Sequence, residues 1–138
     1  MDPKDELRQV LFTYFNGIYN GDVPALESIF HPRTELFGEV KGQEYQKTLA
    51  DYLNGVGTRK SPWALGEPFL MKILFVDLAG PIALAKVNCP MLGFNYIDYL
   101  SLVRFDDKWL IVSKTITHVE PGSYKSRRPA PRHSRNHE

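Results

Sequence analysis

The chain has only one cysteine, Cys89, and no long run of apolar residues. A single cysteine cannot form a disulfide within the chain, which is typical of proteins in reducing compartments. The first residues carry no apolar segment of the kind found in secretory signal peptides. No apolar run approaches the roughly 18 residues that a membrane-spanning helix needs. We therefore expect a cytoplasmic protein that has no membrane-spanning segment.

Excess charge of one sign and metal-ligand motifs are also missing. The formal net charge is +1, so the chain has no overall field that would attract nucleic acid. The spacings of His, Cys and Glu that are typical of metal sites do not occur, and neither does a glycine-rich phosphate loop. We therefore expect no metal and no cofactor, and we do not expect nucleic acid as a partner.

Hydrophobic residues, by contrast, make up 43% of the 138 residues, which is enough for the core of one domain. Residues 3–19 carry apolar side chains at spacings of three and four, which predicts an amphipathic helix. Asp2 is a suitable N-cap for it. Asp22 can cap a second, short helix over residues 23–30. A third helix is predicted over residues 42–53.

From residue 69 onward the apolar pattern changes to a period of two, which predicts strands. The expected strands cover residues 69–77, 83–88, 94–105 and 109–119, and a shorter strand precedes the third helix at residues 34–40. Short turns make the later strands antiparallel neighbours. Residues 54–68 form a long polar loop in this prediction, and such loops often serve as lids or binding loops. The order of the elements predicts an α+β fold.

We expect the chain to divide into one domain, residues 1–120, and a basic, proline-rich tail, residues 121–138. The tail holds five Lys and Arg residues among eighteen. It cannot bury enough apolar surface to fold, so we expect it to be disordered. Contact with nucleic acid or an acidic surface is the alternative, but a solvated tail is favoured.

Both faces of the predicted strand over residues 94–105 are apolar. Ile97, Tyr99 and Val103 lie on one face, and Tyr96, Leu100 and Leu102 lie on the other. The helices can cover only one face of the sheet, so the other face needs a second cover. A homodimer packed through the outer sheet face, with a two-fold axis, is the simplest cover.

Three segments carry a resemblance to a known family: Asn20-Gly-Asp22, Phe30-His-Pro32 and Lys108-Trp-Leu-Ile111. With the pattern around them, over residues 5–119, they resemble the nuclear transport factor two-like, or ketosteroid-isomerase-like, superfamily, and within it the putative lumazine-binding branch. The resemblance implies a cone-shaped fold with three N-terminal helices packed on a curved, mostly antiparallel sheet. It also implies a dimer through the outer sheet face and a pocket between the helices and the inner face.

The isomerase branch uses three catalytic side chains, and the resemblance maps them onto this chain. Tyr14 matches the tyrosine of the first helix. The aspartate base falls at Phe37-Gly38, and the second, protonated aspartate falls on Ser101, so neither carboxylate is present at its position. Steroid-type isomerase chemistry is therefore not expected.

The same resemblance indicates which strand faces look into the pocket. The strand residues expected to line it are Tyr99, Ser101, Thr115 and Thr117, which share one face by the period of two. Asp98 and Lys114 have the opposite parity, so we expect them on the outer face, as an ion pair where two chains of the dimer meet. The alternative for the threonines is that they are simply good strand residues.

Four further residues are candidates for ligand binding: Tyr14, Phe37, His31 and Trp63. Tyr14 could present its hydroxyl to a ligand, although a core tyrosine bonded to the backbone is the alternative. His31 could line the pocket mouth, although an interaction with the helix dipole is the more ordinary role. Trp63 lies in the long loop, where it could close over a ligand or simply pack on the rim.

These expectations leave three functions open. The first is a small-molecule-binding protein with an internal pocket. The second is a cofactor-independent isomerase, cyclase or lyase that uses Tyr14 as hydrogen-bond donor and a Glu or His near the mouth as base. The third is a protein-interaction module. A perturbed titratable group inside the cavity would favour the enzyme, and a filled cavity beside an exposed apolar patch would favour the interaction module.

Overall fold

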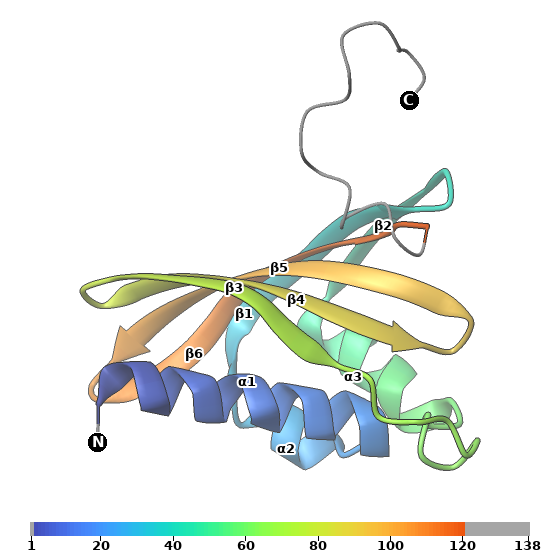
Figure 1. The fold of residues 1–138 in the computed structure, drawn as a ribbon, viewed down its shortest axis with the longest axis horizontal. Coiled ribbons are helices and arrows are strands. Elements are labelled where there is room, and N and C mark those ends of the chain that lie inside the picture. Colours follow the sequence, from blue (N-terminus) through green and yellow to red (C-terminus); the bar gives the residue numbers. More distant parts are fainter. Residues whose placement is uncertain (1, 121–138) are drawn as a thin grey trace, which may run out of the picture.

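The structure, a computed structural model, describes residues 2–120 (Figure 1). In this range the elements are α1 Pro3–Asn20, α2 Val23–Glu27, β1 Phe30–Val40, β2 Gln43–Thr48, α3 Leu49–Thr58, β3 Lys72–Ala79, β4 Ile82–Met91, β5 Phe94–Phe105 and β6 Lys108–His118. The predicted tail, residues 121–138, lies outside the described residues. None of the described helices is long and apolar enough to cross a membrane.

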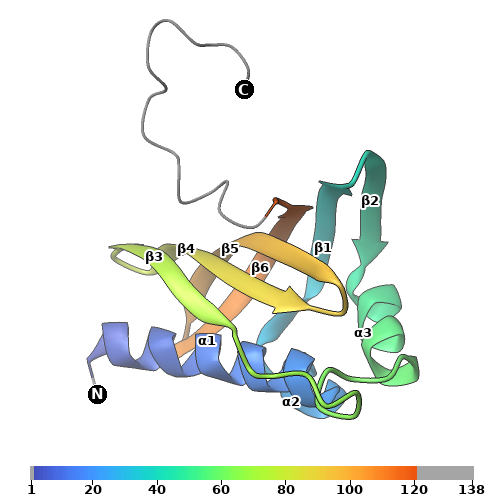
Figure 2. The ribbon, with the colours of Figure 1, turned by 45° about the vertical axis from the view of Figure 1, so that its right-hand side comes forward.

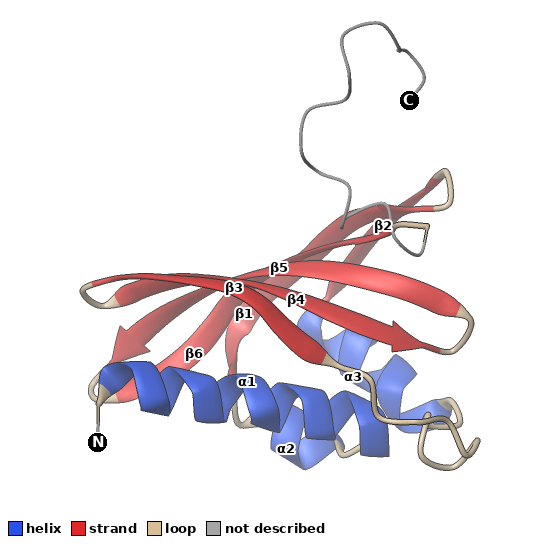
Figure 3. Cartoon of the chain, in the orientation of Figure 1, coloured by secondary structure: helices blue, strands red, loops and turns tan. Residues whose placement is uncertain are grey.

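The six strands form one curved, mixed sheet in the order β2-β1-β6-β5-β4-β3. β1 and β6 are parallel, and every other neighbouring pair is antiparallel. Figures 1 and 2 show that α1 runs along one face of the sheet, with α2 near it and α3 at the end where β2 lies. Figure 3 shows that the helices gather on that one face. The predicted α+β class and the mostly antiparallel sheet are confirmed.

The first helix forms where the sequence predicts it. The Asp2 carboxylate accepts a hydrogen bond from the N–H of Lys4 at 3.0 Å, and Gly21, with φ at 69°, ends the helix in the left-handed region. The apolar side of α1 buries Leu7, Leu11, Tyr14, Phe15 and Ile18. Burial of this side also brings one polar atom, the Tyr14 hydroxyl, into the interior of the molecule.

The third helix lies later in the chain than the sequence predicts, and the prediction of a helix over residues 42–53 is wrong. Lys41 and Gly42 have positive φ angles of 50° and 85° and make a two-residue turn. This turn joins β1 to β2 as a hairpin. α3 begins only after Thr48, whose hydroxyl accepts a hydrogen bond from the N–H of Asp51 at 3.1 Å.

Several other boundaries also differ from the prediction, among them the ends of α2 and α3. α2 ends at Glu27 rather than at residue 30, because Phe30 already pairs with Ile111 as the start of β1. α3 continues to Thr58, so the loop predicted over residues 54–68 begins later than expected. The described range therefore holds three helices before β3, but two strands separate the third helix from the first two.

A β-bulge in β6 decides which side chains of that strand face the helices. In the ladder with β5, the partners shift between Ser113 and Ile111, so Val112 is an extra residue in β6. Ile111 is buried before the bulge, and Lys114 is buried after it. A bulge reverses the alternation of a strand, and this one turns the Lys114 side chain toward the helices.

Candidate functional site

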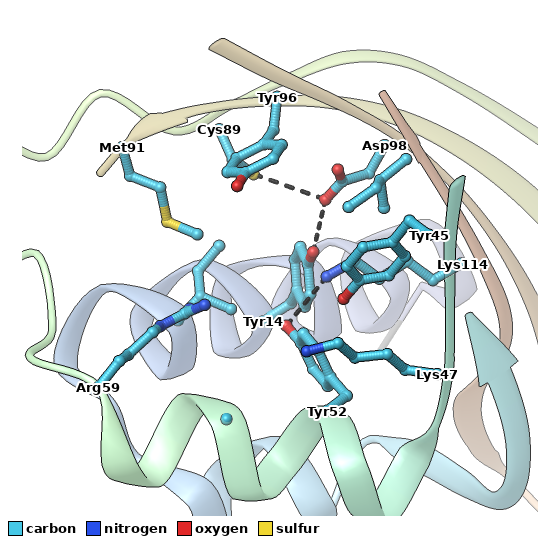
Figure 4. A pocket seen from close by; sticks show the side chains of 13 residues that line it. Tyr14, Tyr45, Lys47, Tyr52, Arg59, Cys89, Met91, Tyr96, Asp98 and Lys114 are labelled. Atoms are coloured by element: carbon cyan, nitrogen blue, oxygen red, sulfur yellow. Dashed lines mark hydrogen bonds between the residues drawn. The ribbon is translucent and has the colours of Figure 1, made fainter. Parts of the chain in front are cut away.

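A cavity of about 300 Å³ lies between the helices and the inner face of the sheet (Figure 4). It is lined by Tyr14 and Ile18 of α1, Tyr45 and Lys47 of β2, Tyr52 and Gly55 of α3, Cys89 and Met91 of β4, Tyr96 and Asp98 of β5, Lys114 and Ile116 of β6, and Arg59, which follows α3. Polar and titratable side chains outnumber aliphatic ones on this wall. The interior of a domain is usually lined by apolar side chains instead.

Tyr14 and Asp98 form a buried hydrogen-bonded pair in the cavity wall. The Tyr14 hydroxyl donates to Oδ2 of Asp98 at 2.5 Å, and the Cys89 thiol donates to the same oxygen at 3.8 Å. Tyr14 is 0% exposed and Asp98 is 2% exposed. A buried carboxyl is tolerated only when donors satisfy it, and these two donors supply that requirement.

Lys114 lies beside this pair. Its ammonium group donates to the Tyr52 hydroxyl at 3.0 Å. The same nitrogen lies 4.1 Å from the centre of the Tyr52 ring and 5.1 Å from that of Tyr14, distances at which an aromatic face attracts a cation. Figure 4 shows the nitrogen among these tyrosine rings. An ammonium group has three N–H donors, so two remain beyond the bond to Tyr52.

Burial shifts the protonation of these three groups. Burial raises the pKa of Asp98 above its usual 3.8, although Lys114 and the Tyr14 hydrogen bond partly oppose the shift. Burial and the Asp98 carboxyl raise the pKa of Tyr14 well above 10.0. Burial lowers the pKa of Lys114, but Tyr52 and Asp98 outweigh burial and leave this pKa above its usual value. At neutral pH Lys114 is therefore charged, Tyr14 is protonated, and Asp98 is more basic than an ordinary carboxylate.

Two further cations, Lys47 and Arg59, line the cavity nearer to solvent. The Lys47 nitrogen lies 5.5 Å from the centre of the Tyr45 ring, and it would lie 3.8 Å from a Cβ placed on Gly55. Arg59 is exposed. Burial raises the pKa of Tyr45, and Lys114 and Arg59 oppose the shift. The inner cation Lys114 and the outer cation Arg59 therefore both act on the same side chain of the cavity wall, Tyr45.

This arrangement can bind a polar ligand and can move a proton. The tyrosine hydroxyls and the three cations offer hydrogen-bond donors to ligand oxygen atoms. A carboxyl with a raised pKa, such as Asp98, accepts a proton more readily than an ordinary aspartate. Within residues 2–120, no three His, Cys, Asp or Glu side chains are placed to hold a metal ion together.

The sequence-predicted strand residues lie on the other face of the sheet. Tyr99, Thr115 and Thr117 line a separate space of about 160 Å³ there. Ser101 lies two residues beyond Tyr99 on the same face. Phe37 pairs with Thr115 and is exposed. Of the predicted ligand-binding residues, Tyr14 is the one that lies in the cavity.

The predicted positions of Asp98 and Lys114 on the outer face of the sheet are also wrong. Both side chains lie on the inner face, 2% and 5% exposed, and not on the outer face. The prediction followed from strand parity, with the face that holds Tyr99 and Ser101 assigned to the pocket by the resemblance. Here Tyr14 and Tyr52 satisfy the two groups, and the bulge at Val112 reverses the alternation of β6.

Trp63 and His31 lie outside the cavity wall. Trp63 is 65% exposed in the segment after α3, where its backbone N–H donates to the Tyr19 carbonyl at 3.0 Å. The Nδ1 atom of His31 accepts a hydrogen bond from the N–H of Arg33 at 3.1 Å, and its ring centre lies 5.7 Å from that of Phe105. The structure thus brings neither residue to Tyr14.

Sequence reasoning missed Asp98, Lys114 and Tyr52. One signal for Asp98 is present, because this single charge interrupts the apolar series that contains Tyr96 and Leu100. A charge in an apolar series indicates a buried partner. The resemblance placed the second carboxylate position on Ser101, whereas the carboxyl beside Tyr14 belongs to Asp98, three residues earlier.

Comparisons with known proteins agree with this fold. A structure of an NTF2-like protein of unknown function from Silicibacter pomeroyi DSS-3 is 24% identical with a TM-score of 0.75, and the match covers 83% of this chain and 94% of that one. A structure of an NTF2-like protein of unknown function from Shewanella baltica OS155 is 21% identical with a TM-score of 0.74, and the match covers 86% of this chain and 94% of that one. A third NTF2-like protein of unknown function, from Methylobacillus flagellatus KT, is 23% identical with a TM-score of 0.73, and the match covers 87% of this chain and 94% of that one. At these identities the likeness concerns the fold alone.

A comparison with curated proteins finds no match. The family model for putative lumazine-binding proteins, in contrast, matches residues 2–117, which is most of the chain. Its extent agrees with the helices and the sheet described above. The chain therefore belongs to the putative lumazine-binding family.

Proposed function

We propose that the protein binds a small organic molecule in the cavity beside Tyr14. The observation that carries this proposal is the wall itself, in which four tyrosines and four charged side chains surround about 300 Å³ of space. Side chains of this kind are costly to place around an empty interior, whereas a ligand uses them. The family description points to the same general role.

We further propose that two chains pair through the outer sheet face and that residues 1–120 act as one domain in the cytoplasm. Five large apolar side chains on that side of the sheet are exposed: Phe37, Phe75, Ile82, Leu84 and Tyr99. A patch of this kind on a sheet is typical of an interface. A second copy of the chain, related by a two-fold axis, would cover this patch, and the patch therefore supports the homodimer predicted from the alternating pattern.

Replacing Gly55 with leucine should close the cavity without disturbing the fold. Gly55 lies in α3, and a Cβ there would contact only the Lys47 nitrogen, at 3.8 Å. A leucine side chain would project into the space that a ligand needs. We expect native mass spectrometry of the protein from its own host to show a dimer with a retained small molecule, and Gly55→Leu to lose at least about 90% of that molecule, since steric exclusion leaves no alternative pose.

Asn54→Leu is the matched control, because it adds the same side chain to an exposed position of the same helix. It should retain the small molecule. Equal retention by Gly55→Leu and Asn54→Leu would contradict the proposed binding site. A monomer at the same concentration would contradict the proposed pairing through the outer face.

A second function, proton transfer on the bound molecule, is favoured by the state of Asp98. The raised pKa of this carboxyl makes it a better base than an exposed aspartate. Lys114, 5.1 Å from the Tyr14 ring, can stabilise negative charge on a ligand oxygen. No Glu or His is among the residues that line the cavity, so Asp98 replaces the base that we expected near the mouth. Such a reaction would be an isomerisation or a lyase-type step without a cofactor.

This second function predicts exchange of an acidic carbon-bound proton with solvent. With 2-tetralone in D₂O, Asp98 would take the α-proton, Lys114 would face the enolate oxygen, and the exchanged carboxyl would return a deuteron. We expect exchange to be about 100-fold faster with the unchanged protein than with Asp98→Asn, followed by proton NMR. Identical exchange rates would leave ligand binding as the function of the site.

A further inference from the structure

The charges on the cavity wall do not balance. The lining contains three cations, Lys47, Arg59 and Lys114, and one carboxyl, Asp98. The wall therefore carries a formal charge of +2 when Asp98 is ionised and +3 when it is protonated. The raised pKa of Asp98 reduces its ability to neutralise the cations. Residues 1–120 hold 12 Lys and Arg against 15 Asp and Glu, so the cavity wall is positive within a part of the chain that is negative overall.

None of the three cations forms an ion pair with a carboxylate within residues 2–120. The ammonium of Lys114 bonds to a neutral hydroxyl, that of Tyr52. The Lys47 nitrogen lies over the ring of Tyr45. Cations at a partly desolvated site that outnumber the carboxyl beside them gain from a further anion, since the low local dielectric strengthens the attraction.

The rings around the cavity add a second constraint. Tyr45, Tyr52 and Tyr96 all line it, and Figure 4 shows their rings around one open space. Aromatic walls favour a flat ligand, because stacked and edge-on contacts need a planar partner. About 300 Å³ is the size of a small-ligand pocket and fits one or two fused rings.

We infer that the ligand is a planar organic anion, with a carboxylate or another anionic oxygen group against Lys114 and a ring system among the tyrosines. This inference rests on the proposed function and specifies its ligand class. Lys114 supplies the innermost positive charge, with two N–H donors beyond its bond to Tyr52. Lys47 and Arg59 lie between this group and solvent, where they attract the anion during entry.

A matched set of naphthalene probes tests the inference. We expect the protein to bind 2-naphthoate at least about tenfold more tightly than the neutral 2-naphthamide, measured by isothermal titration calorimetry, because a charge-assisted hydrogen bond exceeds a neutral one. 2-Naphthalenesulfonate separates the two kinds of anion. Tighter binding of the sulfonate than of the carboxylate would assign the site to a tetrahedral oxyanion, and the reverse would assign it to a carboxylate.

The double variant Lys47→Gln/Arg59→Gln should reduce the preference for the anion at least about threefold, because it weakens binding of 2-naphthoate more than binding of 2-naphthamide. Lys86→Gln/Lys108→Gln removes the same charge away from the cavity and should retain the preference. Both variants change side chains that are at least partly exposed, so folding is retained.

The outcomes separate this inference from the proposed function. Equal affinity for 2-naphthoate and 2-naphthamide, with both abolished by Gly55→Leu, would overturn the anion inference and support binding in the cavity. Affinity for both probes that Gly55→Leu does not reduce would overturn the binding site and the inference together. Failure of all three probes to bind at millimolar concentration would also overturn both.

Discussion

Replacing Lys114 with methionine is expected to destabilise the protein by about 3 kcal/mol at neutral pH, which is the range seen when one member of a buried charged cluster is removed. Lys114 is 5% exposed, and its positive charge lowers the pKa of Asp98. Methionine retains the length of the side chain but loses the charge and the bond to Tyr52. Urea unfolding at pH 7 measures the loss.

The loss should shrink at acid pH. The folded pKa of Asp98 already lies above its unfolded value of 3.8, and loss of Lys114 raises it further. A carboxyl with a raised folded pKa costs stability only above its unfolded pKa, and the cost grows until the pH reaches the folded pKa. The difference between the unchanged protein and Lys114→Met should therefore be smaller at pH 3 than at pH 7. A difference that is equal at both values would contradict the coupling between the two groups.

The double variant Lys114→Met/Asp98→Asn is the control for this prediction. An asparagine oxygen can still accept the hydrogen bond of Tyr14, but it holds no charge that needs Lys114. We expect the double variant to recover about half of the lost stability, since two residues of one buried cluster are not additive. A double variant as unstable as the sum of the single ones would show that Lys114 stabilises the fold independently of Asp98.

Gly38→Ala is expected to destabilise the protein by about 3 kcal/mol or more, at the upper end of the cost of overfilling a packed interior. Gly38 of β1 pairs with Ile116 in the parallel ladder with β6. A Cβ at Gly38 would lie 2.0 Å from the Ile116 carbonyl oxygen, so the two strands must separate. Urea unfolding at pH 7 measures the change in the free energy of unfolding.

Gly55→Ala is the matched control for Gly38→Ala. Its Cβ would approach only a flexible lysine end, at 3.8 Å, and alanine is favoured over glycine inside a helix by about 0.5–1 kcal/mol. We expect this control to be neutral or slightly stabilising. If both alanine variants keep the stability of the unchanged protein, the contact between β1 and β6 is looser than the structure has it. Such a result would also weaken the placement of Lys114, which pairs with Leu36 in the same ladder.

Local signals in the sequence predict much of the fold. The period of three and four in α1, with Asp2 before it and Gly21 after it, is a local pattern, and it gives the helix nearly to the residue. The alternation in β5 gives that strand over residues 94–105 as predicted. β2 is different, because Lys41-Gly42 serves as a hairpin turn and the apolar residues after it fit a helix equally well. Only its pairing with β1 decides between the two.

The candidate site is less predictable because it depends on pairings that no short segment contains. Tyr14 is found from its position in the first helix, and the structure places it in the cavity. The facing of Lys114 relative to Ile111 depends on the bulge at Val112, which only the ladder between β5 and β6 reveals. Asp98 and Lys114 are acceptable inside because Tyr14 and Tyr52, distant in sequence, satisfy them. Strict alternation carried from Ile111 along β6 therefore places Lys114 on the wrong face.

The sheet order divides the cavity wall into a part on central strands and a part at the sheet edge, and the two parts tolerate substitutions differently. Asp98 and Lys114 belong to β5 and β6, which have neighbours on both sides, while Lys47 lies on β2, at the edge of the sheet. Arg59 follows α3, which continues directly from β2. Substitutions and insertions in this edge unit disturb one strand pairing, whereas changes to the central pair disturb several. We therefore predict that changes in the edge unit alter the Lys47 and Arg59 side of the cavity and leave the Tyr14–Asp98 pair and Lys114 in place.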